Sequence, residues 1–333
     1  VIKRYKTVLP ASCIVNPQEE NGMKIIYAWL ATYAKIRSWA TNKGQREAIE
    51  KALEISDPEV HNEEKDIKDL LEKRKYIVLQ GAPGTGKTYT ALNIAKDNKD
   101  NKKYTQTFFE QFHAETTFSD FVYGIEPNIS KDMSQPQYQA KKGILYQAVE
   151  YAINNKNEKV LLIIDEINRA NLSNVLGPVF YLFEYQTGMR KVEISVGDMK
   201  LTQLPDNLYV IATMNTADRS VAVVDFALRR RFAWYTLRPH EIRPGVGKKF
   251  MKETYNKFAD IFFQYATDDE LNLQPGQSYF IVGTNESEKE MKERMIYELL
   301  PLMKEYLTEG YLLKAKDAFC DLFLKETGKL MYE

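Results

Sequence analysis

One stretch of the sequence, YIVLQGAPGTGKT at residues 76–88, constrains the fold more than any other. Its first four residues are apolar and partly β-branched, which predicts a buried parallel strand, and a helical pattern follows over 89–95. The glycines between them let successive backbone N–H groups face phosphate oxygens at a helix N-terminus. A Gly-rich strand-to-helix turn without a ligand is the alternative. Because strand, complete P-loop motif and helix coincide, we predict nucleotide binding.

The P-loop motif assigns a role to two side chains in particular. Lys87 is expected to reach the β- and γ-phosphates of a nucleotide, and the hydroxyl of Thr88 is expected to ligate Mg²⁺. The predicted nucleotide-binding residues are Gly81, Ala82, Pro83, Gly84, Thr85, Gly86, Lys87, Thr88 and Tyr89.

Composition limits the partners of this chain. The 333 residues leave room for two compact units, at about 150 residues per domain. Lys+Arg and Asp+Glu are equal at 46 each, so no global field attracts the chain to nucleic acid or to an anionic membrane. Any contact with DNA is therefore expected to be local or to be made by another part.

The cysteines and the apolar stretches indicate the compartment. Cys13 and Cys320 are far apart, which argues against a disulfide framework or a zinc site and predicts a reducing cytoplasm. No apolar stretch reaches the ~18 residues of a spanning helix, and no signal peptide opens the chain. We expect a soluble cytoplasmic protein without membrane partners. A start at Val1 rather than Met is compatible with excision from a longer polypeptide.

A second apolar strand is predicted over 160–164, and it ends in Asp165 and Glu166. An acidic pair at the carboxyl end of a central strand suits Walker B chemistry, in which Asp165 holds Mg²⁺ and Glu166 polarises the attacking water. Many strands end in acidic residues, so the pair alone is a moderate signal. Its position behind a P-loop strengthens the assignment.

A third apolar strand is predicted over 208–213, and Asn215 follows it. An Asn at this strand end can hold the lytic water or touch the γ-phosphate, although an Asn that closes a turn is the alternative. A helix over 221–228 is closed by the arginines 229–231. Such a cluster is either a solvated patch or a source of an arginine for the γ-phosphate of a neighbouring subunit.

The remaining patterns complete a prediction of an α/β fold with a central parallel sheet, followed by a small all-α domain. We expect a helical lead-in over 1–70, an α/β core over 71–237 and a helical domain over 238–333. Predicted helices span 23–40, 45–55, 57–75, 143–153, 247–266, 288–306 and 311–327, a further strand spans 104–109, a short helix and turn span 118–127, a polar loop spans 128–142 and a hairpin spans 190–204.

The ordered motifs resemble the AAA+ superfamily, with the helical domain as its lid. Three segments narrow the resemblance to the McrB family, the motor subunits of modification-dependent restriction endonucleases: DEINRANLS at 165–173, MNTADRS at 214–220 and VVDFALRRRF at 223–232. The resemblance covers about 76–306 and does not include the first seventy residues, where that family places its target-recognition domains.

This resemblance implies a ring-forming, typically hexameric, Mg²⁺-dependent NTPase that uses GTP or ATP. It also implies an McrC-like nuclease subunit as partner and hydrolysis that drives DNA translocation and cleavage. Asn215 would be sensor 1, Arg169 and the arginine cluster would act across the subunit interface with Arg230 as the best finger, and Asp218 and Arg219 would arrange the water and the interface. The implied catalytic residues are Glu166, Asn215, Arg230, Arg231, Arg169, Asp218 and Arg219, and the implied metal ligands are Thr88 and Asp165.

The chain departs from the family pattern in places. Its P-loop is the plain eight-residue form, whereas some members carry a longer loop, so a GTP preference does not carry over. Gln277 stands where a histidine is expected, and Arg294 is a candidate sensor 2. No DNA-recognition domain is evident.

Two other functions remain open at this point. A MoxR-like or dynein-related remodeller of proteins uses the same core, but the MNTADRS segment favours the restriction motor. A nucleotide-regulated scaffold would bind without hydrolysis. The presence of Glu166, Asn215 and the arginines argues against the scaffold.

Overall fold

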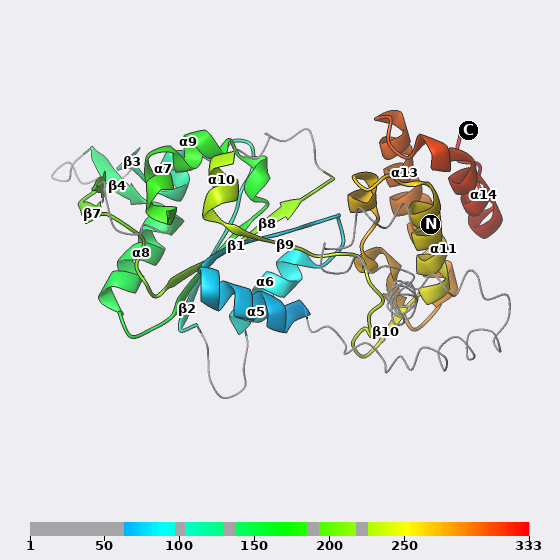
Figure 1. Ribbon diagram of the computed structural model, residues 1–333, viewed down its shortest axis with the longest axis horizontal. Coiled ribbons are helices and arrows are strands. Elements are labelled where there is room, and N and C mark those ends of the chain that lie inside the picture. The colour runs from blue at the N-terminus through cyan, green and yellow to red at the C-terminus, as the bar shows by residue number, and fades with distance from the viewer. Residues whose placement is uncertain (1–62, 97–103, 129–136, 185–192, 218–225, 333) are drawn as a thin grey trace, which may run out of the picture. The chain divides into compact units, whose positions relative to one another are not determined.

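The computed structural model describes residues 63–96, 104–128, 137–184, 193–217 and 226–332 (Figure 1). The helices predicted over 23–40 and 45–55 lie outside the described residues, as do Asp218, Arg219 and most of the predicted helix over 221–228. Within the described part, no helix is both long and apolar enough to cross a membrane.

A five-stranded sheet with the order β2-β5-β8-β1-β9 forms the centre of the α/β part. Every neighbouring pair is parallel, as the apolar runs predict. This order places the P-loop strand beside β8, and β8 beside the strand that ends in the acidic pair. The strands are β1 (Tyr76–Gly81), β2 (Gln106–Gln111), β5 (Val160–Asp165), β8 (Leu208–Asn215) and β9 (Ala233–Thr236).

Alternate residues of the strands enter two different cores. In β1, Ile77 and Leu79 pack with α5 (Glu63–Arg74) and α6 (Lys87–Lys96), whereas Val78 faces the opposite core. That second core contains α8 (Ile144–Asn154), α9 (Leu172–Leu176) and part of α10 (Phe226–Arg231). Figure 1 shows these two sets of helices on opposite faces of the sheet. The sheet is therefore buried on both faces, and its carboxyl edge remains for a site.

Short elements connect these layers. α7 (Phe118–Phe121) carries a capping box between Thr117 and Asp120, and it leads into β3 (Tyr123–Pro127), which pairs antiparallel with β4 (Tyr138–Lys142). A second hairpin joins β6 (Ile194–Val196) to β7 (Met199–Leu201). Two 3₁₀ segments, Ile167–Arg169 and Gly177–Phe183, flank α9.

The C-terminal part has its own aromatic core, as the helical prediction requires. Phe258, Phe262, Phe319 and Phe323 are buried there at the contact of α11 with α14. Its elements are β10 (Lys248–Phe250), α11 (Lys252–Tyr265), 3₁₀ segments Glu270–Leu273 and Gln277–Phe280, β11 (Ile281–Gly283), α12 (Ser287–Arg294), a π-helical turn Met295–Leu299, α13 (Leu300–Thr308), a 3₁₀ turn Leu313–Ala315 and α14 (Lys316–Thr327). The predicted domain boundary at 237/238 stays a prediction.

Several predicted elements need correction. The helix predicted over 247–266 begins only at Lys252, because residues 248–250 pair with 281–283 as a small antiparallel sheet. The turn and polar loop predicted near 123–142 contain the β3–β4 hairpin. The strand β9 was not predicted. Finally, α5 is not simply a solvated helix, because Ile67 and Leu71 are fully buried.

Candidate functional site

The P-loop connects β1 to α6 at the carboxyl edge of the sheet. Gly84 and Gly86 have φ values of +79° and +86°, in the left-handed region that residues with a Cβ atom rarely adopt. A Cβ atom on Gly81 would lie 2.4 Å from the carbonyl oxygen of Leu237. The loop conformation therefore depends on glycine at these positions. Tyr89, in the first turn of α6, has an exposed fraction of 71%.

Lys87 is buried against the loop that precedes it. Its Nζ donates hydrogen bonds to the carbonyl oxygens of Gly81 at 3.0 Å and Ala82 at 2.8 Å. Burial lowers the pKa of the Lys87 amine to about 8, although the carboxylates of Glu166 and Asp165 oppose this shift. The amine thus sits beside the loop whose N–H groups suit phosphate, with acidic groups close enough to influence it.

Asp165 is the last residue of β5, and its carboxylate accepts hydrogen bonds from two hydroxyl groups. The Oγ1 atoms of Thr88 and Thr213 donate to its Oδ1 at 2.7 and 2.6 Å. Hydroxyl and carboxylate oxygens are hard ligands of the kind that Mg²⁺ takes together with phosphate and water. Thr88 and Asp165 therefore fit the magnesium site of a P-loop protein.

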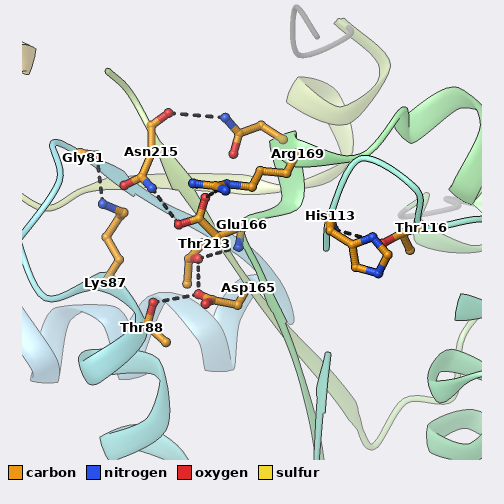
Figure 2. A network of polar contacts seen from close by, with 11 residues as sticks. Gly81, Lys87, Thr88, His113, Thr116, Asp165, Glu166, Arg169, Thr213 and Asn215 are labelled. Atoms are coloured by element: carbon orange, nitrogen blue, oxygen red, sulfur yellow. Dashed lines mark hydrogen bonds and ion pairs between the residues drawn. The ribbon is translucent and has the colours of Figure 1, made fainter. Parts of the chain in front are cut away.

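Glu166 follows Asp165 in a left-handed conformation, with φ 55°. Its Oε1 accepts a hydrogen bond from Asn215 Nδ2 at 2.7 Å, and its Oε2 accepts one from Arg169 Nε at 2.6 Å. Figure 2 shows these side chains joined above Asp165 and Thr213. Both oxygens of the carboxylate are thus oriented by neighbours from β8 and from the 3₁₀ segment after β5.

Two further residues of this cluster had no role in the sequence-based prediction. Thr213 is 1% exposed, and its hydroxyl also accepts the backbone N–H of Glu166 at 3.0 Å. Asn168 is 4% exposed and donates from Nδ2 to the carbonyl oxygen of Asn215 at 3.4 Å. The available signal was a polar residue next to the end of an apolar strand, which does not reveal its partner on another strand.

The arginines that end α10 have different environments. Arg229 and Arg230 are exposed, and the guanidinium of Arg229 lies 5.2 Å from the centre of the Trp234 ring. The side chain of Arg231 is only 8% exposed, forms an ion pair with Glu184 and lies over the ring of Phe180 at 4.8 Å. Its burial favours a packing role for Arg231, and Arg230 remains an accessible candidate finger. Asp218 and Arg219 lie outside the described residues.

A segment of the C-terminal part contacts the backbone of the P-loop. The backbone N–H of Gly276 donates to Pro83 O at 2.9 Å, and that of Ser278 donates to Gly84 O at 3.0 Å. Gln277 Nε2 adds a bond to Thr85 O at 2.9 Å. Arg294 contacts the same segment, because its Nη1 donates a hydrogen bond to Ser278 O at 3.3 Å. The helical part is therefore connected directly to the predicted phosphate-binding loop.

Comparison with known proteins agrees with this arrangement. Residues 76–232 match the AAA domain family of the dynein-related subfamily. The chain is 33% identical over 257 residues to the "Type IV methyl-directed restriction enzyme EcoKMcrB subunit" of Escherichia coli (strain K12), covering 70% of this chain and 54% of that protein. It is 29% identical over 205 residues to the "Type II restriction enzyme BsuMI component YdiS" of Bacillus subtilis (strain 168), covering 51% of this chain and 59% of that protein.

The chain thus spans little more than half the length of these two relatives. The matched AAA domain includes the P-loop, and the central parallel sheet carries the acidic pair and Asn215 at one edge. An α/β core with these features and a C-terminal helical part is the architecture expected of an AAA+ NTPase. From this domain match and these relatives, the chain is an McrB-like AAA+ protein.

Proposed function

We propose that this chain hydrolyses the β–γ phosphoanhydride bond of ATP or GTP with Mg²⁺, and that it does so as a subunit of a homo-oligomeric, hexameric ring. The single observation that carries the proposal is the orientation of Glu166. Both of its carboxylate oxygens are held, by Asn215 at 2.7 Å and Arg169 at 2.6 Å, at the carboxyl edge of the sheet that also carries the P-loop. A carboxylate fixed in this place is suited to accept a proton from an attacking water.

Each residue has a defined part in the proposed reaction. The P-loop N–H groups and the Lys87 ammonium bind the phosphates, and Thr88 and Asp165 hold the metal ion, which supplies charge neutralisation for the phosphates when bound. The water oxygen attacks the γ-phosphorus, the bond to the β–γ bridging oxygen breaks, and Glu166 takes the proton of the water. Arg230 of a neighbouring subunit offsets the negative charge that develops in the transition state.

We further propose that hydrolysis drives DNA translocation or cleavage through an McrC-like nuclease subunit. Similarity to two proteins named as restriction enzyme components supports this proposal. The equal numbers of acidic and basic residues favour DNA contact through a partner or through a further domain rather than through the surface of this chain as a whole.

The test is turnover of ATP and GTP measured side by side, with Mg²⁺ or with EDTA, and with and without the McrC-like subunit and DNA. We expect Mg²⁺-dependent release of phosphate that the partner increases. Binding of nucleotide without turnover in any of these mixtures would instead favour the nucleotide-regulated scaffold.

A second function has one observation in its favour, because the matched AAA domain belongs to the dynein-related subfamily. A protein remodeller of that kind would hydrolyse nucleotide but would not respond to a nuclease subunit or DNA. Stimulation by a folded protein substrate, together with no response to the nuclease subunit, would favour this candidate.

A further inference from the structure

We propose that Thr213 is a positioning residue whose single hydroxyl group holds both Asp165 and Glu166 in place. This inference rests on the proposed hydrolysis. The hydroxyl of Thr213 donates to Asp165 Oδ1 at 2.6 Å and accepts the backbone N–H of Glu166 at 3.0 Å. It therefore connects β8 to the metal-binding carboxylate and to the backbone of the proposed base at the same time (Figure 2).

The position of Thr213 explains why a side chain is needed here. β5 and β8 pair in register as far as Ile164 and Ala212. Beyond that pair, Glu166 has φ 55°, a left-handed conformation that is unfavourable for a residue with a Cβ atom. The Thr213 hydroxyl accepts a hydrogen bond from the backbone N–H of Glu166 at the point where the pairing of β5 with β8 ends. It therefore stabilises the turn that carries the Glu166 carboxylate.

The direction of each hydrogen bond is fixed by chemistry. A backbone N–H only donates and an ionised carboxylate only accepts, so the Thr213 hydroxyl must give its single proton to Asp165. Thr88 donates to the same oxygen at 2.7 Å. Removal of the Thr213 hydroxyl therefore leaves Asp165 with one of these two donors and Glu166 without its backbone acceptor, while the contacts of Lys87 stay unchanged.

The test compares Thr213→Val, which keeps the shape and removes the hydroxyl, with Thr213→Ser, which keeps the hydroxyl. We expect Thr213→Val to lower kcat by about 10- to 100-fold, as outer partners of metal ligands do. Thr213→Ser should restore most of the turnover. We also expect Thr213→Val to weaken the increase in affinity that Mg²⁺ gives to a non-hydrolysable nucleotide.

Thr327→Val is the matched control. Thr327 is 5% exposed, donates to Phe323 O at 2.6 Å and accepts the N–H of Lys329 at 3.1 Å, so it also has one buried hydroxyl with one donor and one acceptor contact. It lies at the end of α14, outside the proposed site. Its loss should lower thermal stability without changing kcat or the effect of Mg²⁺ on binding.

The outcomes separate this inference from the proposed function. Turnover and Mg²⁺ enhancement of Thr213→Val within twofold of the wild type would overturn the role of Thr213, as would Thr213→Ser being as impaired as Thr213→Val. If Thr213→Val does not fold, Thr213→Ala and Thr213→Ser differ from each other only by the hydroxyl and give the same comparison. A wild type that never hydrolyses nucleotide contradicts the proposed function, and the Mg²⁺ effect on binding then still decides the role of Thr213.

Discussion

Arg169 Nε lies 2.6 Å from Glu166 Oε2 of the same chain. The family resemblance implies that Arg169 acts across a subunit interface, and that role stays a prediction. In the single chain, however, Arg169 and Asn215 each donate a hydrogen bond to a different oxygen of the Glu166 carboxylate. Their effects on hydrolysis should therefore be coupled.

A double-mutant cycle measures this coupling. We expect Arg169→Ala and Asn215→Ala each to reduce kcat, and the double variant to lose less than the product of the single losses. The difference should correspond to about 0.5–3 kcal/mol, the range for residues that share a partner. Steady-state kinetics of the four proteins give the coupling, and strictly additive losses would show that the two residues do not act through Glu166.

The pKa of Lys87 predicts how nucleotide binding depends on pH. Burial lowers this pKa from 10.5 to about 8, so the nucleotide-free protein loses the Lys87 charge as the pH rises through 8. The affinity for a non-hydrolysable triphosphate should then fall by about tenfold per pH unit above that value. Titrations between pH 7 and pH 9.5, in roughly half-unit steps, measure this slope.

Lys87→Arg is the matched control, because a guanidinium stays charged over this range. Its affinity is expected to be lower overall but nearly independent of pH. The same shift has a consequence for folding: the unfolded chain binds more protons between pH 8 and 10.5, so Lys87 makes stability rise with pH in that window. If the nucleotide affinities of the wild type and of Lys87→Arg fall with pH at the same slope, Lys87 is not the group whose charge controls the pH dependence of binding.

Much of the fold was predictable because apolar runs report burial directly. β5 is buried along its whole length and β8 is buried up to Asn215, so their Val, Ile and Leu content identified them as central strands. β9 was missed because AWYT is short and follows three arginines. The β3–β4 hairpin was missed because its polar strands are stabilised by each other and by α7 rather than by a hydrophobic pattern of their own.

The site was predictable where a motif and a strand end coincide. Gly81 to Thr88, Asp165, Glu166 and Asn215 meet because parallel strands present their carboxyl ends at one edge. Contacts between distant segments were not predictable in this way. Thr213 and Gln277 have partners on other elements, and three adjacent arginines gave no sign that Arg231 is buried while Arg230 is exposed.

The contact of the helical part with the P-loop leads to a prediction for Gly276. A Cβ atom at this position would lie 2.0 Å from Gly84 C and 2.2 Å from Gly84 O. Gly276→Ala must therefore separate the two segments, and we expect a loss of about 1–3 kcal/mol in stability, the cost of overpacking, together with weaker nucleotide binding.

Gly245→Ala provides the comparison for this variant, because a Cβ atom there meets nothing within 4 Å. Thermal unfolding and nucleotide titration of both proteins give the two quantities. If Gly276→Ala binds nucleotide like Gly245→Ala, the segment around Gly276 does not influence the P-loop.

The exposure of Arg230 predicts complementation between inactive subunits. Glu166→Gln lacks the base but has the arginine, whereas Arg230→Ala has the base but lacks an arginine that can be worth a rate factor of about 10³. An equal mixture should regain part of the turnover where an Arg230→Ala site adjoins a Glu166→Gln neighbour. Arg229→Ala, which removes the neighbouring exposed arginine, should hydrolyse nucleotide without a partner variant. No recovery in mixed rings shown to form would contradict a role of Arg230 in trans.

The most direct test of the proposed hydrolysis is a comparison of binding and turnover in Glu166→Gln. Gln keeps the size of the side chain and a carbonyl oxygen but does not accept the proton of the water, so kcat should fall by about 10²- to 10⁴-fold. The affinity for Mg²⁺–nucleotide should remain close to that of the wild type, because Lys87, Thr88 and Asp165 are unchanged. Turnover near the wild-type rate, with binding intact, would contradict the assignment of Glu166 as the catalytic base.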